Sequence, residues 1–402
     1  MPSTHIHVEV STGPTPGQID IEIVERKGLG HPDTICDSVM EKISQALSKA
    51  YIEKFGRILH HNCDKGLLIA GQVEHRLGGG RVIEPMRLVI GDRATLIREF
   101  DVAELAVETA RAWFLDNLPE IDPNRDLVFQ VELKGGSAEL TEIFREPSIT
   151  AAANDTSAAV GYAPLSETEQ LVLAAEKFLN GRGFKERFPA SGQDVKIMGV
   201  RRGTHLDLTI AMPLLDRFVE SEDSYFRQLE EMREALSIYL GPRSDALDEI
   251  TVRCNTLDRR GAGLAGIYLS VLGTSAEDAD SGEVGRGNQV NGIIALNRPR
   301  GSEAAAGKNP VSHVGKIYNV LTHLLAEQIY RQVPGLEEVF VWLCSRIGAP
   351  VNDPQVAAVQ VKLKPWATDA DVADAIRQIV GRELERMPEF CKELAQGKYS
   401  IC

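Results

Sequence analysis

Alternating apolar and polar residues first indicate a strand near the beginning of the chain. Isoleucines occupy every second position from Ile19 to Ile23, with acidic residues between them, which is the period of a half-buried strand. A break with two glycines and a proline, residues 27–33, follows directly. Apolar residues then recur at every fourth position from Ile35 to Leu47, which predicts a helix with one buried face. Residues 1–17 are polar and are interpreted as a loose arm.

The same alternation of patterns continues along the chain and predicts an α+β fold. Predicted helices cover residues 102–118, 166–180, 224–240, 311–332 and 369–387, the second opened by a capping box at 166–169. Predicted strands cover residues 66–71, 87–91, 127–133, 195–200, 206–212, 250–254, 266–272, 292–296, 339–344 and 357–363. Many strands neighbour another strand in sequence, which favours largely antiparallel sheets over a doubly wound parallel sheet. Three sections of similar content suggest a repeated architecture, with domains expected at 1–147, 148–272 and 273–402.

The composition and the net charge limit the classes of protein to which the chain can belong. The formal net charge is -14, which argues against a nucleic-acid partner but leaves room for a small anion in a local basic pocket. We find no signal-peptide pattern and no apolar run long enough for a membrane span. The six cysteines are scattered without a C-x-x-C pair, as expected in a reducing compartment. A cytoplasmic enzyme is the expectation.

The stretch from Gly301 to Lys316 contains the first candidate for anion binding. Gly307 and Lys308 precede Asn309-Pro310, and Asn at an N-cap followed by Pro is a helix-start signal. A lysine beside a helix N-terminus suits a phosphate. An ordinary capped helix with a solvated lysine explains the stretch equally well.

A second candidate is the sequence Gly30-His31-Pro32-Asp33. Asp33 is read most simply as an N-cap. In the functional interpretation, Asp33 binds a divalent metal and His31 contacts a phosphate oxygen, because Mg²⁺ is usually held by one or two carboxylates together with substrate phosphates.

Four further stretches carry polar groups, each with a simpler alternative. Residues 60–65, H-H-N-C-D-K, are interpreted as a ligand-facing strand end; zinc is disfavoured because adjacent strand residues point to opposite faces. Asp155 lies in an Asx-type turn or binds a cationic amine. Asp194 and Lys196 form a surface ion pair or supply a second phosphate-binding lysine. Residues 284–292 form a glycine-spaced loop suited to an anion, although such loops are weak evidence alone. Together these stretches favour chemistry on a polyphosphate.

The longer motifs carry a resemblance to a known family. V-E-R-K-G-L-G-H-P-D, H-H-N-C-D-K, N-D-T-S-A-A-V-G-Y-A-P-L-S-E-T-E, G-R-G-N-Q-V-N-G and E-A-A-A-G-K-N-P-V-S-H-V-G-K-I-Y-N occur in this order. The chain closely resembles the archaeal-type branch of S-adenosylmethionine synthetase from about Ile19 onward. The resemblance implies three intertwined α+β domains related by a pseudo-threefold axis, and a dimer or larger oligomer with active sites at the subunit interface. It also implies ATP and L-methionine as substrates, two Mg²⁺ per site, and K⁺ as an activator.

The resemblance also assigns expected roles to residues. His31, Lys196 and Lys308 are expected to act on the triphosphate, and Asp155 and Asp64 to bind methionine. Asp33 and Asp280 are expected to hold metal, with Asp278 nearby. The remaining expected ATP or phosphate contacts are Lys65, Lys134, Gly135, Gly136, Ser137, Ala138, Glu139, Asp194, Arg286 and Asn288.

Two positions depart from the family pattern. Gln289 stands where the pattern has arginine, and Cys63 where it favours threonine. Loss of the arginine would cost a few kcal/mol at a buried phosphate contact and under about 1 kcal/mol at an exposed one. Gln289 is the only support for a second hypothesis, a nucleotide-binding regulatory subunit without catalysis. A third is a hydrolase of tripolyphosphate or nucleotides that lacks the transfer step.

Overall fold

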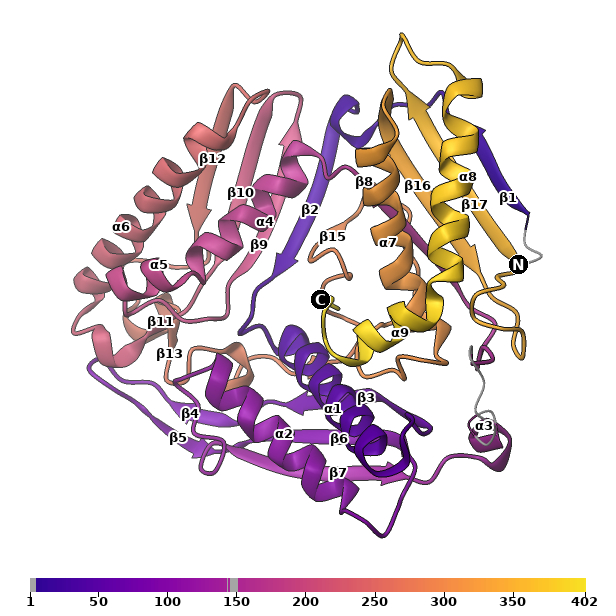
Figure 1. Cartoon of the computed structure of the whole chain (residues 1–402). Helices are drawn as coiled ribbons and strands as arrows, with labels where there is room; N and C mark the ends of the chain where they lie inside the picture. Colours follow the sequence, from indigo (N-terminus) through magenta and orange to yellow (C-terminus); the bar gives the residue numbers. More distant parts are fainter. Residues whose placement is uncertain (1–4, 143, 145–150) are drawn as a thin grey trace.

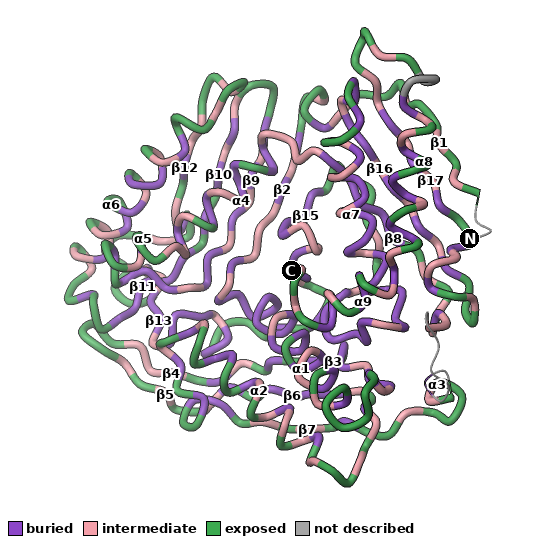
Figure 2. Tube along the Cα trace, in the orientation of Figure 1, coloured by how far each residue is buried: buried purple, intermediate pink, exposed green. Residues whose placement is uncertain are grey.

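Three mixed sheets, each with helices on one face, surround a centre that contains the last residues of the chain (Figure 1). The computed structural model describes residues 5–142, 144 and 151–402. Figure 2 shows buried residues where helices meet sheets, and exposed residues on the outer loops. No helix within these residues is long and apolar enough to cross a membrane.

The first sheet has the order β14-β3-β6-β7 and is covered by α1 and α2. Strand β14 is antiparallel to β3, β3 is antiparallel to β6, and β6 is parallel to β7. The bounds are β14 (Gly282–Glu283), α1 (Pro32–Phe55), β3 (His61–Ile69), β6 (Met86–Ala94), α2 (Val102–Asn117) and β7 (Leu127–Lys134). A short ribbon of β4 (Gln72–Glu74) and β5 (Arg81–Glu84) extends from this sheet, and α3 (Ala138–Glu142) follows β7.

The second sheet repeats this arrangement with β2, β9, β10 and β12, and the third with β8, β16, β17 and β1. The second comprises β2 (Ile21–Lys27), α4 (Glu167–Leu179), β9 (Lys196–Arg202), β10 (His205–Ala211), α6 (Glu222–Leu240) and β12 (Glu249–Cys254), with α5 (Arg182–Arg187) and edge strand β15 (Ile294–Ala295). The third comprises β8 (Ala158–Ala163), α7 (Val314–Gln332), β16 (Leu336–Cys344), β17 (Val356–Leu363), α8 (Asp369–Glu385) and β1 (Ile6–Val10), with α9 (Met387–Ala395) after α8. A further pair is β11 (Leu214–Leu215) with β13 (Leu269–Ser270).

Each of the three sheets contains four strands in the same order, joined by two antiparallel pairings and one parallel pairing. In the second sheet, β15 adds a further antiparallel pairing with β2. The first strand of each unit, however, comes from a distant part of the chain. Strand β2 leads into α1 of one unit but pairs with β9 of another, and β8 leads into α4 but pairs with β16. The expected α+β fold of three intertwined, pseudo-threefold-related units is therefore confirmed. The domain boundaries at residues 147 and 272 stay a prediction.

Several local expectations were wrong. The arm at residues 1–17 contains β1, which pairs in parallel with β17. The helix expected from residue 311 begins at Val314, and its N-cap is His313, whose Nδ1 accepts a bond from the Gly315 N–H (3.3 Å). Asn309 instead accepts a bond from the Val311 N–H (3.0 Å), closing a turn ahead of the helix. The N-cap of α1 is His31, so Asp33 belongs to the first helical turn.

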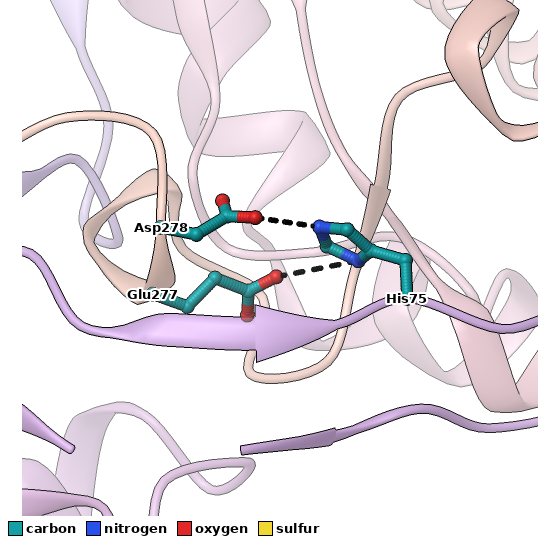
Figure 3. A group of neighbouring side chains, drawn as sticks. All are labelled: His75, Glu277 and Asp278. Carbon is teal, nitrogen blue, oxygen red and sulfur yellow. Dashed lines mark hydrogen bonds and ion pairs between the residues drawn. The ribbon is translucent and has the colours of Figure 1, made fainter. Parts of the chain in front are cut away.

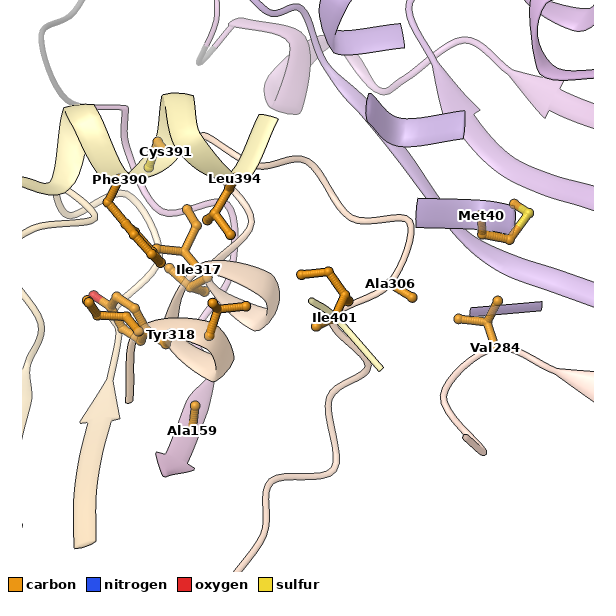
Figure 4. Close-up of a cluster of buried hydrophobic side chains, with 14 of the residues drawn as sticks. Met40, Ala159, Val284, Ala306, Ile317, Tyr318, Phe390, Cys391, Leu394 and Ile401 are labelled. Atoms are coloured by element: carbon orange, nitrogen blue, oxygen red, sulfur yellow. The ribbon is translucent and has the colours of Figure 1, made fainter. Parts of the chain in front are cut away.

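The core is continuous between units that are far apart in sequence. Phe390 and Leu394 of α9 lie against Ile317 and Tyr318 of α7, and the C-terminal Ile401 lies between this group and Ala306 (Figure 4). Burial of large apolar side chains contributes about 2 kcal/mol for each one. This burial fixes the helix that follows the Gly307-Lys308 turn.

A histidine ties the β4–β5 ribbon to the loop at residues 275–280 (Figure 3). The imidazole of His75 lies between two carboxylates, 2.8 Å from Asp278 Oδ2 and 3.9 Å from Glu277 Oε1. Glu277 is fixed by bonds from the Ser270 hydroxyl (2.9 Å) and from the Leu272 N–H (2.6 Å). The hydrogen bond to Asp278 raises the pKa of His75, although burial acts in the opposite direction.

This ion pair between His75 and Asp278 predicts a pH-dependent contribution to the free energy of unfolding. A raised folded-state pKa means that the contribution is complete below the ordinary histidine value of about 6.5 and is lost as the pH rises through the folded-state pKa. We expect wild-type protein to lose about 1 kcal/mol relative to His75→Gln between pH 6 and 9, because the ion pair is partly exposed. Urea unfolding at several pH values measures the difference. The control His7→Gln removes an exposed histidine; equal pH dependence in wild type and His75→Gln would contradict the tie.

Candidate active site

The turn between β2 and α1 positions the first cluster of candidate residues. Gly28 and Gly30 donate backbone hydrogen bonds to the carbonyls of Val195 (2.7 Å) and Gln193 (3.0 Å). A Cβ atom at residue 30 would lie 2.6 Å from the Asp194 nitrogen, so only glycine allows this approach. The turn therefore places the start of α1 against the segment that leads into β9.

His31 is a buried, neutral hydrogen-bond donor in this cluster. Burial lowers its pKa to about 4, with Lys27 and Lys196 acting in the same direction and Asp33 and Asp280 opposing them. Its Nδ1 accepts a bond from the Asp33 N–H (3.2 Å). An accepting Nδ1 leaves the proton on Nε2, so the ring can donate that proton to an anionic oxygen.

Two carboxylates of the same cluster are held by bonds from distant segments. Asp33 Oδ2 lies 2.8 Å from Lys27 Nζ, and Asp33 Oδ1 accepts the N–H of Glu283 (2.9 Å). Asp194 is buried and accepts bonds from both the N–H (2.8 Å) and the hydroxyl (2.5 Å) of Ser275. Burial raises the pKa of Asp194 to about 6 although these two bonds oppose the rise.

Lys196 begins β9 and lies directly opposite Lys27 in the antiparallel pair with β2. Its Nζ is 3.3 Å from Glu25 Oε1, and its side chain is 44% exposed. The expected placement of residues 194 and 196 on one face describes the structure only in part, because Asp194 is buried against Ser275 whereas Lys196 reaches solvent. Lys196 is thus a cation that a ligand can reach.

Lys308 forms the second cluster with residues at the start of β3. The Lys308 ammonium is buried and paired with Asp64 Oδ2, and it lies 3.2 Å from Glu303 Oε2. Its backbone forms an antiparallel bridge with Asn62. The preceding Gly307 has φ +75°, and a Cβ there would lie 2.3 Å from the Cys63 carbonyl oxygen, so the turn requires glycine.

Asp64 is the shared carboxylate of this cluster. Its Oδ1 lies 2.7 Å from Lys65 Nζ. Burial alone would raise the pKa of Asp64, but Lys308 and Lys65 hold that pKa below its ordinary value. Burial raises the pKa of the neighbouring Cys63 thiol, which makes that thiol unreactive as a nucleophile.

Sequence reasoning missed a buried layer beneath Lys308. Lys316 Nζ lies 2.6 Å from Glu41 Oε2, and both side chains are buried. The Ser44 hydroxyl bonds to the Lys308 carbonyl (2.9 Å) and to His61 Nε2 (2.9 Å). Lys316 lies within the quoted G-K-N-P-V-S-H-V-G-K motif, but nothing local indicates its carboxylate partner. Asp37 was also missed, although it lies one helical turn after Asp33.

The segments expected to contact methionine and ATP lie beside the second cluster. The Asn154 N–H donates to the Ser312 carbonyl (3.1 Å), which places the turn that contains Asp155 next to the start of α7. A Cβ on Gly136 would lie 2.5 Å from His60 Nδ1, so the loop of residues 134–139 lies over the start of β3. Lys134 Nζ lies 3.2 Å from Glu132 Oε2. Residues 143 and 145–150, beyond this loop, lie outside the described residues.

The glycine-spaced loop at residues 284–292 contacts both clusters. The Asn288 amide accepts the Lys27 N–H (3.0 Å) and donates to the Lys27 carbonyl (2.7 Å). Arg286 lines a cavity of about 440 Å³ together with Lys308, Asp64 and Lys65. Gln289 instead lines an adjoining cavity of about 320 Å³, which shares Glu303 with the first cavity and also contains Asn288. The cavity of about 730 Å³ along α7 contains none of the expected site residues, so we locate the site by its charged groups.

The two clusters lie at opposite ends of one edge of β3. Leu67 pairs with Glu283, which bonds Asp33, and Asn62 pairs with Lys308. These pairings are five positions apart on β3. One chain therefore presents two groups of cations and carboxylates, with Arg286 between them: its carbonyl accepts a bond from Lys27, and it lines a cavity with Lys308.

Comparison with known proteins identifies the family to which the chain is similar. The family model described as "S-adenosylmethionine synthetase (AdoMet synthetase)" matches residues 4–398. The S-adenosylmethionine synthase of Haloarcula marismortui is 39% identical over 405 residues, covering 100% of both chains. That of Aeropyrum pernix is 41% identical over 404 residues, covering 98% of this chain and 99% of the relative.

A solved structure with a related fold is that of an unusual S-adenosylmethionine synthetase from Campylobacter jejuni. It has a TM-score of 0.59 and 16% identity, covers 94% of each chain, and so supports the fold alone. The sequence matches carry the assignment: the chain belongs to the S-adenosylmethionine synthetase (methionine adenosyltransferase) family.

Proposed function

We propose that the protein joins ATP and L-methionine by direct attack of the methionine sulfur on C5′ of ATP. The new S–C5′ bond makes a sulfonium, and the broken C5′–O bond leaves its electron pair on tripolyphosphate. The thioether carries no proton, so this step requires no general base. Water then cleaves the tripolyphosphate to phosphate and diphosphate. Catalysis rests on orientation and on stabilising the charge of the leaving group.

The observation that carries this proposal is the neutral, buried His31 beside Lys27 and Lys196. An Nε2–H donor beside two lysines suits a phosphate oxygen. Lys196 and Lys308 supply positive charge to the triphosphate, and Arg286 and Lys65 extend that charge along the cavity. The loop of residues 134–139 is proposed to contact ATP.

For methionine, Asp155 is the better placed of the two expected carboxylates. Its Oδ1 accepts the N–H of its neighbour Thr156 (2.7 Å), whereas both oxygens of Asp64 already face lysines. A free ammonium group is attracted to a carboxylate whose charge has not been neutralised. We assign the methionine amine to Asp155. We propose that Asp64 acts on the amine only through the electrostatic potential that it shares with the neighbouring lysines.

Asp33 and Asp280 would hold Mg²⁺, two ions per site, with Asp194 close by. Carboxylate oxygens are the ligands that Mg²⁺ prefers, and the charges of Asp33 and Asp280 both act on His31. The bound ions would neutralise phosphate charge. K⁺ as activator and a cytoplasmic location complete the proposal; the cysteines in the described residues are all unpaired, which fits a reducing compartment.

We further propose self-association with each active site shared between two subunits. The two candidate clusters of one chain are attached to β3 at Leu67 and at Asn62, five positions apart. Apolar side chains also lie exposed on the sheet faces: Ile21 (48%), Leu67 (39%), Ile69 (39%) and Val128 (40%). Exposed apolar groups of this kind suit a second subunit. A second chain would bring its own Lys308 cluster to the His31 cluster.

The first prediction from the proposed function concerns the reaction itself. Wild-type protein with ATP, methionine, Mg²⁺ and K⁺ is expected to form S-adenosylmethionine, phosphate and diphosphate, measured by chromatography. Lys308→Ala is expected to lose about 10²–10³-fold in kcat, the usual loss when one charge-stabilising donor is removed. Lys362→Ala, which removes a half-buried lysine paired with Glu337 (3.4 Å), is the control. Phosphate release without methionine at the same rate would instead indicate a hydrolase, and ATP binding without turnover a regulatory subunit.

The second prediction tests the shared site. His31→Asn and Lys308→Ala are each expected to be nearly inactive as pure dimers. A heterodimer of the two, isolated by two affinity tags, contains one doubly altered site and one unaltered site. It is therefore expected to recover about half of the wild-type activity. If each site were built from one chain, the heterodimer would stay as inactive as its parents.

A further inference from the structure

Lys27 places its ammonium on the carboxylate to which we assign a metal ion. Lys27 Nζ donates to Asp33 Oδ2 (2.8 Å) and to the Arg286 carbonyl (2.5 Å), and the lysine side chain is 13% exposed. The other oxygen of Asp33 accepts the N–H of Glu283. The ammonium thus lies on the oxygen of Asp33 that is also nearest to His31, whose Nδ1 is 3.9 Å from Oδ2.

The backbone of Lys27 is fixed although its side chain has four rotatable bonds. The Asn288 amide binds both its N–H and its carbonyl, and the Thr34 hydroxyl donates to the same carbonyl (3.1 Å). Lys27 also ends β2, opposite Lys196. A fixed backbone with a flexible side chain lets the ammonium move within the cluster while the site keeps its shape.

A divalent cation that binds Asp33 Oδ2 competes with the Lys27 ammonium (2.8 Å) for the charge of that oxygen, because two cations at such a separation repel each other. Metal binding at this oxygen therefore favours movement of the ammonium away from Asp33. The displaced ammonium stays beside His31, where its charge already acts on the imidazole. It then lies within reach of the phosphate chain that arrives with the metal.

We propose that Lys27 is a positioning residue that neutralises Asp33 in the ligand-free enzyme and exchanges with the divalent cation when nucleotide binds. This inference rests on the proposed function, in which Asp33 is a metal ligand. Two consequences follow. The free enzyme binds divalent cations weakly, because the cation competes with an internal ammonium. Nucleotide strengthens that binding, because its phosphates accept the displaced ammonium.

The test measures binding of Mn²⁺, a spectroscopic substitute for Mg²⁺, to the nucleotide-free enzyme by electron paramagnetic resonance. Lys27→Met removes the charge and keeps the length of the side chain. It is expected to bind Mn²⁺ about tenfold more tightly than wild type, which corresponds to about 1.4 kcal/mol, because the competing ammonium is gone. Lys27→Arg, which keeps the charge, and Lys362→Met, a remote lysine of similar exposure, are expected to match wild type.

Adding Asp33→Asn to Lys27→Met is expected to abolish the gain in affinity, because the ammonium acts through Asp33. Lys27→Gln gives a second neutral variant if Lys27→Met unfolds. Unchanged Mn²⁺ affinity in the neutral variants, or a gain that persists after the Asp33→Asn substitution, would overturn the inference. Failure of the proposed function is separate: wild type would then form no S-adenosylmethionine, whatever the Mn²⁺ affinities are.

Discussion

The site depends on buried lysines that are each paired with a carboxylate from a distant part of the chain. Lys308 is paired with Asp64, 244 residues away, and Lys316 with Glu41. A buried charge whose partner is removed costs roughly 3–5 kcal/mol, so each pair fixes where its cation can lie. Lys308 and Lys316 are therefore held in place before any ligand arrives. Stability and the arrangement of the site come from the same contacts.

The threefold repeat explains why three similar helix starts serve different purposes. The helices α1, α4 and α7 occupy equivalent positions and begin after His31, Ser166 and His313. At α1 and α7 the N-terminal region faces lysines. At α4 the equivalent position is closed by buried ion pairs, in which Arg298 binds Glu169 and Glu338. One position of the repeat therefore stabilises the fold, and the other two carry the candidate chemistry.

Neutral histidines accompany the lysines at both clusters. Burial lowers the pKa of His31 to about 4 and that of His313 to about 3, and nearby lysines act in the same direction. These rings add hydrogen bonds without adding charge. The positive charge beside both rings therefore comes from lysine side chains.

The sequence by itself determined the fold class, the family and the segments that contain the candidate residues. Hydrophobic periodicity marks most helices and strands, and motifs around His31, Asp64 and Lys308 are long and specific, because local spacing encodes local structure. The tertiary structure alone decided which charges meet: Lys27 with Asp33 through a turn that two glycines permit, Lys316 with Glu41, and β1 with β17. In those contacts, the sequence around one residue does not indicate which residue is its partner. The exchange of strands between units, which only complete folding of the chain produces, brings them together.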